Sequence, residues 1–371
     1  MGSASLWRGA DGGGIGVIFK NFEFARPIII FIKVDRADSI GGGLYGCGSR
    51  LIFHLDARAM MKIVFMGSAE FGLPSLGELL ARHRVAAAVS APARPKGRGL
   101  KLVDTPVAAY VKKAASVPLL TPEDVAAPQF IDKLTAFGAD LFVVVAFRIL
   151  PKAVFSIPKM GTLNVHASLL PRYRGAAPIH RAIEAGETET GVTVFRIDEG
   201  VDTGEIITQK KTPIDGQETA PELYQRLSVM GAAALIEAID ALESGKAAPV
   251  RQDGAEATKA PKLTKEEGRV DWRLPVNEVF NRIRAHKPFP GSYFFLNGKR
   301  INIEWGMVSG GGGTNPPPPT GTVLIARGDC IDVQCGIGAL RITKVKPEGR
   351  QTMDVHSFLL GHEVLEGTVL E

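Results

Sequence analysis

Hydrophobic and polar positions divide the chain into three stretches of different character. Up to residue 60 the glycine-rich sequence shows neither helical spacing nor the alternation of a half-buried strand. From Met61 onward, short apolar runs alternate with helical repeats, which is the order of βαβ units. After residue 262 the pattern changes to many short strand-like runs separated by turn residues. The pattern therefore predicts an α/β domain followed by a smaller β domain.

The α/β part is expected to hold a mainly parallel sheet, because its apolar run at residues 141–146 is continuous and thus typical of a strand covered on both faces. Strands are expected at residues 62–67, 85–89, 141–146, 162–166, 192–197 and 205–209. Helices are expected at residues 68–80, 106–113, 129–137 and 219–245. The last helix begins with a capping box, Thr219-Ala220-Pro221-Glu222, and stops at Gly245.

The second part of the chain predicts a helix, a hairpin and three further strands. Asn297-Gly298 is a strong signal for a two-residue hairpin turn. The helix is expected at residues 277–286, the hairpin at 293–303 and the strands at 322–326, 331–335 and 340–345. Such short strands favour a small barrel.

These boundaries divide the chain into four segments. Residues 1–60 are interpreted as an extension, either an over-called translation start or a disordered segment, and residues 61–245 as the α/β domain. Residues 246–262, rich in Ala, Lys and Pro, are expected to form a linker before the β domain at residues 263–371.

The strand at residues 162–166 carries the most distinctive polar residues. Strict alternation places Asn164 and His166 on one face and leaves Leu163 and Val165 on the other. A Gly/Pro-bearing turn follows, and a loop bracketed by glycines at residues 198–204 offers the carboxylate of Asp202. Together these groups make a hydrogen-bond donor, a proton carrier and an orienting acid. The alternative reading is structural, since a lone histidine at a strand end is often a satisfied core group.

The whole motif decides between these readings. It reads Asn-x-His-x-Ser-Leu-Leu-Pro-x-x-Arg-Gly-x-x-Pro from Asn164, followed by Glu-Thr-Gly-Val-Thr and Asp-Thr-Gly. From about residue 61 to the C-terminus the chain resembles the folate-dependent formyltransferases, and among them the methionyl-tRNA formyltransferases. The resemblance implies a Rossmann-like catalytic domain and a small OB-like β-barrel domain.

The resemblance also implies the chemistry. It makes Asn164, His166 and Asp202 catalytic, with the first two donating to an oxyanion and Asp202 setting the protonation state of the imidazole. The cosubstrate is 10-formyltetrahydrofolate, no metal is needed, and the turn at residues 146–151, shorter here than in the family and without its glycine, flanks the folate pocket. Tetrahydrofolate contacts are expected from Ser168, Leu169, Leu170 and Pro171.

A basic loop follows the second predicted strand. Residues 91–101 stand on a Pro/Gly frame that excludes a helix or a central strand, and they carry Arg94, Lys96, Arg98 and Lys101. Such a loop is either a solvated surface or a phosphate and base contact. The resemblance favours the second reading, because the family inserts a loop here into the acceptor stem of charged initiator tRNA; the family's Asp before Arg-Pro is replaced by Ala93.

Composition narrows the class of protein without deciding it. With 45% hydrophobic and 22% charged residues the chain is typical of soluble proteins, and a net charge of +5 permits a polyanionic partner. The three cysteines, Cys47, Cys330 and Cys335, form no disulfide framework or zinc motif. No apolar run approaches the roughly 20 residues of a membrane span. Taken with the folate and tRNA partners that the resemblance implies, these features lead us to expect a cytoplasmic monomer that binds no membrane.

Rival functions share parts of this signature. Glycinamide ribonucleotide and nucleotide-sugar formyltransferases share the Asn/His/Asp set, but the former lack the second domain and the latter lack the basic loop. A formyl-tetrahydrofolate hydrolase would use the same residues on water. A nonenzymatic tRNA-binding module is disfavoured by the intact triad, and a nicotinamide oxidoreductase by the missing G-x-G-x-x-G fingerprint after Gly67.

Overall fold

The computed structural model describes residues 61–96, 101–310 and 316–370, together with the backbone of three strands nearer the N-terminus. These strands are β1 (Ser3–Arg8), β2 (Gly14–Lys20) and β3 (Ile28–Lys33), paired antiparallel in that order. The interpretation of residues 1–60 as an extension stays a prediction. The Ile-rich run of β3 has high strand propensity without any alternation.

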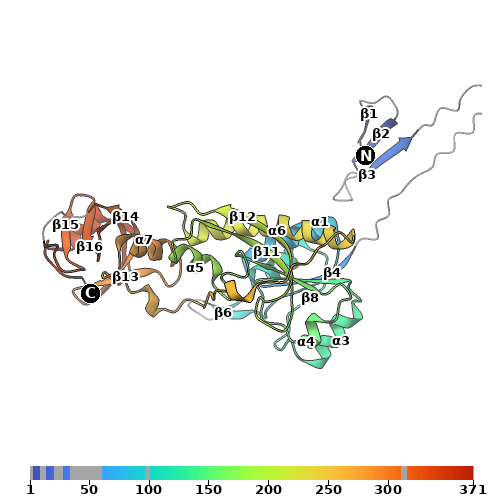
Figure 1. The fold of residues 1–371 in the computed structure, drawn as a ribbon, viewed down its shortest axis with the longest axis horizontal. Helices are drawn as coiled ribbons and strands as arrows, with labels where there is room; N and C mark the ends of the chain where they lie inside the picture. Colours follow the sequence, from blue (N-terminus) through green and yellow to red (C-terminus); the bar gives the residue numbers. More distant parts are fainter. Residues whose placement is uncertain are drawn as a thin grey trace, which may run out of the picture.

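A seven-stranded sheet forms the centre of the α/β part, with strand order β12-β11-β10-β9-β4-β5-β8 (Figure 1). The strands from β10 to β8 pair in parallel, and β11 and β12 add an antiparallel edge. Their bounds are β4 (Lys62–Gly67), β5 (Arg84–Val89), β8 (Leu119–Leu120), β9 (Leu141–Val145), β10 (Thr162–His166), β11 (Glu189–Arg196) and β12 (Ile206–Pro213).

The strand order reverses between β4 and β9. From β4 the chain moves outward through β5 to β8 and then returns to β9 and β10 on the other side of β4. In an open α/β sheet a ligand crevice lies at such a reversal, beyond the carboxyl ends of the strands. The topology therefore marks the ends of β4, β9 and β10 as the place for a site.

Helices cover both faces of this sheet (Figure 1). Alternation along β4 explains why, since Ile63 and Phe65 are buried in one apolar cluster and Val64 and Met66 in another on the opposite face. Helices α1, α2, α5 and α6 contribute to the first cluster, and α3 and α4 to the second. The bounds are η1 (Glu70–Gly72), α1 (Leu73–Arg82), α2 (Pro106–Ala114), α3 (Pro128–Ala136), α4 (Lys152–Phe155), α5 (Pro178–Glu184) and α6 (Ala220–Glu243).

The second part of the chain is an antiparallel β domain with its own apolar core. Its main strand order is β13-β14-β17-β16-β15, and β18 pairs with β17. Asn297 and Gly298 have φ of +49° and +74°, which confirms the predicted hairpin turn. The bounds are η3 (Glu266–Gly268), α7 (Val276–Ala285), β13 (Ser292–Leu296), β14 (Lys299–Ser309), β15 (Val323–Arg327), β16 (Cys330–Gln334), β17 (Ala339–Pro347), β18 (Met353–Asp354) and α8 (Val355–Gly361).

The segment expected to be a linker is bound along the catalytic part. Val250 forms an isolated β-bridge with Ile206, and Ala260, which is fully buried, exchanges backbone hydrogen bonds with Arg174 and Ala177. A short 3-10 helix, η2 (Gly254–Glu256), lies between these anchors. The sequence predicts an unattached linker here because these contacts are made mostly by backbone groups. Backbone contacts leave no apolar pattern in the sequence.

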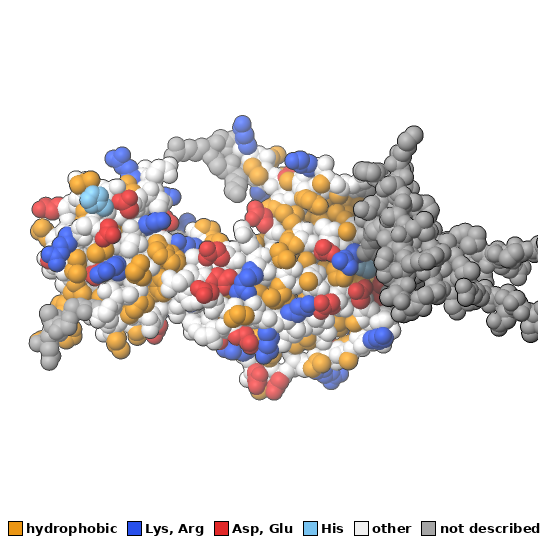
Figure 2. Space-filling model, turned by 90° about the horizontal axis from the view of Figure 1, so that it is seen from above, with side chains coloured by type: hydrophobic (Ala, Val, Ile, Leu, Met, Phe, Trp, Pro, Cys, Tyr) orange, Lys and Arg blue, Asp and Glu red, His pale blue; other side chains and the backbone are white. Residues whose placement is uncertain are grey.

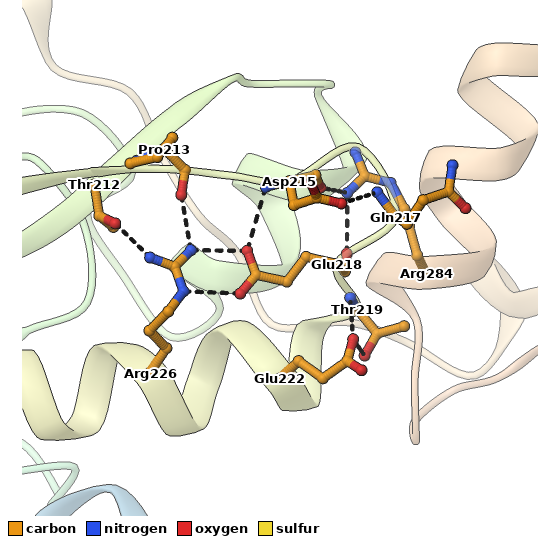
Figure 3. A network of polar contacts seen from close by, with 9 residues as sticks. All are labelled: Thr212, Pro213, Asp215, Gln217, Glu218, Thr219, Glu222, Arg226 and Arg284. Carbon is orange, nitrogen blue, oxygen red and sulfur yellow. Dashed lines mark hydrogen bonds and ion pairs between the residues drawn. The ribbon is translucent and has the colours of Figure 1, made fainter.

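Arg284 of α7 joins the two parts of the molecule (Figure 3). Its side chain is buried, and Nη1 donates to the carbonyl oxygens of Asp215 and Glu218 at 3.2 and 3.0 Å, just before α6. Nε and Nη2 donate to the Asn281 carboxamide oxygen. The same segment carries the predicted capping box, in which the Thr219 backbone N–H donates to Glu222. This buried guanidinium is therefore one of the contacts at the domain junction, together with the ion pairs Arg282–Glu184 and Arg181–Glu267.

Replacing Arg284 by Met should destabilise the protein, because the apolar side chain leaves two carbonyl oxygens at the junction without their donor. We expect a loss of about 2–4 kcal/mol in the free energy of unfolding, measured by urea denaturation. The matched control is Arg273→Met, since Arg273 is exposed and pairs only with Asp271. Equal losses from the two variants would contradict a special role for Arg284.

Candidate active site

Asn164 and His166 reach the same cavity from the end of β10. Their neighbours Leu163 and Val165 belong to the core on the other face of the sheet, so the predicted alternation is confirmed. The cavity has a volume of about 550 Å³ and lies at the strand reversal, with Ala69 beyond β4 and Ala146 beyond β9 in its wall. Strand pairing therefore fixes where the amide and the imidazole stand.

Asp202 approaches the imidazole from the loop at residues 198–204. The Asp198 carboxylate closes this loop, accepting from the Gly200 backbone N–H at 3.0 Å and the Thr203 hydroxyl at 2.5 Å. Asp202 has φ of +54°, a conformation that aspartate tolerates better than most residues. A Cβ at Gly204 would lie only 1.7 Å from the carbonyl oxygen of Arg196, so the loop can leave the strand here only through glycine.

Both ring nitrogens of His166 face a defined group. Nε2 lies 2.9 Å from the carbonyl oxygen of Tyr173, and only a protonated nitrogen makes that hydrogen bond. Nδ1 lies 3.6 Å from Asp202 Oδ2, which also accepts the backbone N–H of Gly175 at 2.9 Å. The Tyr173 carbonyl thus selects the tautomer, while the negative field of the Asp202 carboxylate is directed at Nδ1. Both side chains are largely buried, with 7% of His166 and 15% of Asp202 exposed, so this field is weakly screened.

The Asn164 carboxamide has no hydrogen-bond partner among the described residues. It lies at the boundary of the 550 Å³ cavity and a second one of about 130 Å³. Asp202 also lines both. A polar amide left without a partner at the junction of two cavities is available to a ligand group in either of them.

Both the α/β part and the β domain match families of known proteins. Residues 61–239 match the formyl transferase family, and residues 262–363 match the C-terminal domain of formyl transferases. The methionyl-tRNA formyltransferase of Geotalea uraniireducens is 41% identical over 314 residues, covering 84% of this chain and 98% of its own. That of Syntrophus aciditrophicus is 43% identical over 315 residues, with 84% and 99% covered.

The chain belongs to the methionyl-tRNA formyltransferase family.

Solved structures agree with this fold. HypX from Aquifex aeolicus in complex with tetrahydrofolic acid has a TM-score of 0.53 at 20% identity; the match covers 82% of this chain and 47% of HypX, so this chain spans about half of HypX. An N-formyltransferase from Helicobacter canadensis in complex with folinic acid and dTDP-3-aminofucose has a TM-score of 0.56 at 19% identity, covering 79% of this chain and 100% of its own. At such identities the likeness shows the fold alone.

The turn predicted to contact folate is built largely by internal hydrogen bonds. Ser168 and Leu170 are buried, and the Ser168 hydroxyl donates to the Arg172 carbonyl oxygen at 2.7 Å. Thr193 joins the turn to β11, donating to the Ser168 carbonyl oxygen at 2.6 Å and accepting the Leu170 backbone N–H at 3.1 Å. None of residues 168–171 is in the wall of the two cavities that meet at Asn164. Folate contact by Ser168, Leu169, Leu170 and Pro171 therefore stays a prediction.

The basic segment forms a small hairpin separate from the main sheet. Strands β6 (Arg94–Lys96) and β7 (Lys101–Val103) pair antiparallel, which agrees with the exclusion of a helix or central strand. Arg94 and Lys101 are exposed. Arg98 lies outside the described residues, as does the side chain of Lys96. On the face drawn in Figure 2, basic and acidic side chains are interspersed over both parts of the molecule.

Sequence reasoning missed two groups in the site. One is the Tyr173 carbonyl, a backbone atom that leaves no trace in residue types. The other is His180 at the start of α5, which lines the 550 Å³ cavity. Burial, with smaller contributions from His286 and Arg181, holds the pKa of His180 below its usual value, so this ring is neutral at pH 7. The sequence could have indicated this histidine, because it lies only two residues after Pro178, the last residue of the motif.

Within residues 61–96, 101–310 and 316–370, no group of three or more His, Cys, Asp and Glu side chains is arranged to hold a metal ion. In the described residues no helix combines the length and the apolar character that crossing a membrane requires.

Thr193→Val should weaken the 168–171 turn, because the buried Leu170 N–H loses its acceptor and the Ser168 carbonyl loses its donor. We expect the free energy of unfolding to fall by about 1–3 kcal/mol. The control is Thr208→Val on β12, where the side chain has no hydrogen-bond partner among the described residues. Urea denaturation measures both, and a Thr193 variant as stable as the Thr208 variant would contradict this account.

Proposed function

We propose that this chain transfers the formyl group of 10-formyltetrahydrofolate to the α-amino group of methionine on charged initiator tRNA. The observation that carries the proposal is the meeting of two cavities at Asn164 and Asp202, beside His166. A group transfer between two substrates needs such a junction, with donor and acceptor entering from different sides. Relatives 41–43% identical over nearly their whole length are named for the formylation of methionyl-tRNA, which supports the same acceptor here.

The smaller cavity suits the pterin ring. It is lined by the turn that follows β9 and by the Asp202 loop, which offer backbone polar groups to the edge of a flat ring. Ile149 and Val201 are exposed by 80% and 55%, an unfavourable state for apolar side chains that a bound aromatic ring would relieve. This is the turn expected to flank the folate pocket.

The larger cavity suits the aminoacyl end of the tRNA. Phe71, Ile179 and Tyr224 give it apolar walls that can receive the methionine side chain and the terminal adenosine. The Tyr224 hydroxyl accepts the Phe71 backbone N–H at 2.7 Å, and the two rings meet edge to face with centroids 5.2 Å apart. This contact fixes the wall between η1 and α6 before substrate arrives.

The mechanism follows from the hydrogen bonds already present. The neutral α-amine attacks the formyl carbon, and the carbonyl π electrons move to oxygen, where the Asn164 amide donates to the oxyanion. In place of the oxyanion contact expected of His166, we assign it the proton transfer, because the Tyr173 carbonyl already holds Nε2–H. The lone pair of the ring is then on Nδ1, and this nitrogen takes the proton of the attacking amine. Asp202 stabilises the resulting imidazolium, and Nδ1–H then protonates the departing folate nitrogen as the C–N bond breaks. The products are formylmethionyl-tRNA and tetrahydrofolate.

The remaining assignments concern binding and location. We propose that residues 168–171 contact the folate from the turn that leads to Tyr173, and that Arg94, Lys96, Arg98 and Lys101 bind the acceptor stem. Lys344 and Lys346 on β17 would add phosphate contacts from the β domain. We further propose that the protein acts as a monomer in the cytoplasm, where charged tRNA and folate are found.

Removing the oxyanion donor or the acid should impair chemistry and leave folding intact. Asn164→Ala should lower kcat by about 100- to 1000-fold, the usual cost of one oxyanion-hole donor. Asp202→Asn keeps an oxygen for the Gly175 N–H but removes the charge that stabilises the imidazolium, so kcat should fall here as well. Single-turnover formylation of methionyl-tRNA measures both.

The control for these variants is Glu205→Gln. Glu205 directly follows the same loop, and among the described residues its carboxylate approaches only the half-buried Arg196 and the exposed Arg251. We expect its turnover to match the unmodified protein. Near-normal turnover of Asn164→Ala and Asp202→Asn would show that the catalytic assignment is wrong.

Arg98 is expected to select the tRNA. A mismatched acceptor end opens at little cost, and one base contact from an arginine is worth about 1–3 kcal/mol. Arg98→Ala should therefore lower kcat/KM for initiator methionyl-tRNA much more than for an elongator methionyl-tRNA. Lys344→Ala with Lys346→Ala, the control, should weaken both tRNAs alike and flatten the salt dependence. Proportional losses on both tRNAs with Arg98→Ala would reduce the loop to an electrostatic contact.

A further inference from the structure

The segment at residues 250–260, here called the strap, connects the two loops that surround His166. Its first residue pairs with the chain just after the Asp202 loop: the Ile206 and Val250 backbones exchange hydrogen bonds of 2.8 and 2.9 Å. Its last residue pairs with the loop that carries the Tyr173 carbonyl: Ala260 N–H donates to the Arg174 carbonyl oxygen at 2.7 Å. The strap therefore spans from the acid of the site to the group that holds the imidazole tautomer.

Gln252 is the side chain of the strap that contacts both loops at once. Its Nε2 donates to the carbonyl oxygens of Asp202 and Gly204, at 3.0 and 2.8 Å. Its Oε1 accepts from Arg174, with Nε at 3.1 Å and Nη2 at 2.7 Å. Both amide hydrogens and the amide oxygen are thus used, and each partner belongs to one of the two loops. A carboxamide is the one side chain of this length that donates toward one loop and accepts from the other.

The second loop is fitted closely to the strap. Tyr173 N–H donates to the Thr258 hydroxyl at 2.8 Å, and Arg174 N–H donates to the Thr258 carbonyl oxygen at 2.9 Å. Gly175 has φ of +124°, and a Cβ there would lie 2.7 Å from the Ala260 carbonyl oxygen. The backbone groups that hold His166 Nε2 and Asp202 Oδ2 are therefore placed by the strap.

We infer that Gln252 is a positioning residue for the formyl transfer, acting through Asp202 and the Tyr173 carbonyl. It sets the separation of the carboxylate from His166 Nδ1 by fixing the backbone on both sides of Thr203. The 3.6 Å gap at Nδ1 leaves this contact adjustable, so a small shift of the loop changes how well the carboxylate stabilises the imidazolium. The inference rests on the proposed roles of His166 and Asp202. Residues 250–260 also lie between the two stretches, 61–239 and 262–363, that match the formyl transferase family.

The decisive variant is Gln252→Glu. The carboxylate keeps the length and still accepts from Arg174, but it places an oxygen against two carbonyl oxygens and pushes the Asp202 loop away. We expect kcat to fall about 10- to 100-fold, the cost of a displacement on the order of 1 Å in a catalytic group. KM for the tRNA should stay within about twofold, because Gln252 touches neither of the two cavities at Asn164. KM for the formyl donor is free to rise, since the displaced loop at residues 198–202 lines the smaller cavity.

A second variant and a control distinguish a loss of positioning from a general loss of stability. Gln252→Met fills the same space without placing charge against the carbonyls, and it should show the same loss in kcat. Asp253→Asn changes the neighbouring side chain, which is exposed and caps only the 3-10 helix of the strap through the Ala255 N–H. This control should keep both kcat and melting temperature.

A double-mutant cycle with Asp202→Asn separates positioning from general stability. If Gln252 acts through the Asp202 carboxylate, Gln252→Glu should cost less than about threefold in kcat once that charge is gone. The same proportional loss in both backgrounds, or a loss that follows a lower melting temperature and a raised KM for the tRNA, would overturn the inference. If Asp202→Asn is impaired but Gln252→Glu is not, the inference about Gln252 is wrong and the catalytic assignment stands. If Asp202→Asn is fully active, both the catalytic assignment and the inference are wrong.

Discussion

The hydrogen bond from the Gly175 backbone N–H to Asp202 is the contact on which the site depends. It closes a ring of four groups, since Asp202 faces His166 Nδ1, His166 Nε2 bonds the Tyr173 carbonyl, and Tyr173 leads through the chain back to Gly175. A carboxylate and an imidazole this deeply buried are stable together only if each has further partners. The ring supplies them from the backbone, so the two ionisable groups are oriented before a substrate binds.

The rest of the fold can be understood as support for that ring. Parallel pairing of β9 with β10 and antiparallel pairing of β10 with β11 set the position of His166. The Asp202 loop leaves β11 through a closed turn and a glycine that admits no side chain. The strap then ties this loop to the loop of Gly175. Under the proposed function, substrate specificity lies outside the ring, in the two cavities and the basic hairpin.

Much of this arrangement was accessible from the sequence, because it rests on local rules. Alternation along β10 placed Asn164 and His166 together, and glycines around Asp202 indicated a tight loop. Side-chain types could not reveal the Tyr173 carbonyl, which acts through its backbone. They also gave no warning that residues 246–262 pack on the catalytic part, since Gln252 meets partners at Arg174 and Asp202 that are distant in the chain. Residue types likewise gave no sign that Thr193 of β11 holds the turn at residues 168–171.

The most direct test of the central claim is a crystal structure with both substrate sites occupied. A nonreactive analogue of the formyl donor and an amide-linked mimic of methionyl-adenosine would serve as ligands. The account predicts the pterin in the 130 Å³ cavity and the methionyl group in the 550 Å³ cavity. The formyl carbon should then lie about 3–3.5 Å from the amine nitrogen, with its oxygen in hydrogen-bond reach of Asn164. A formyl group bound away from Asn164, or both ligands competing for one cavity, would contradict it.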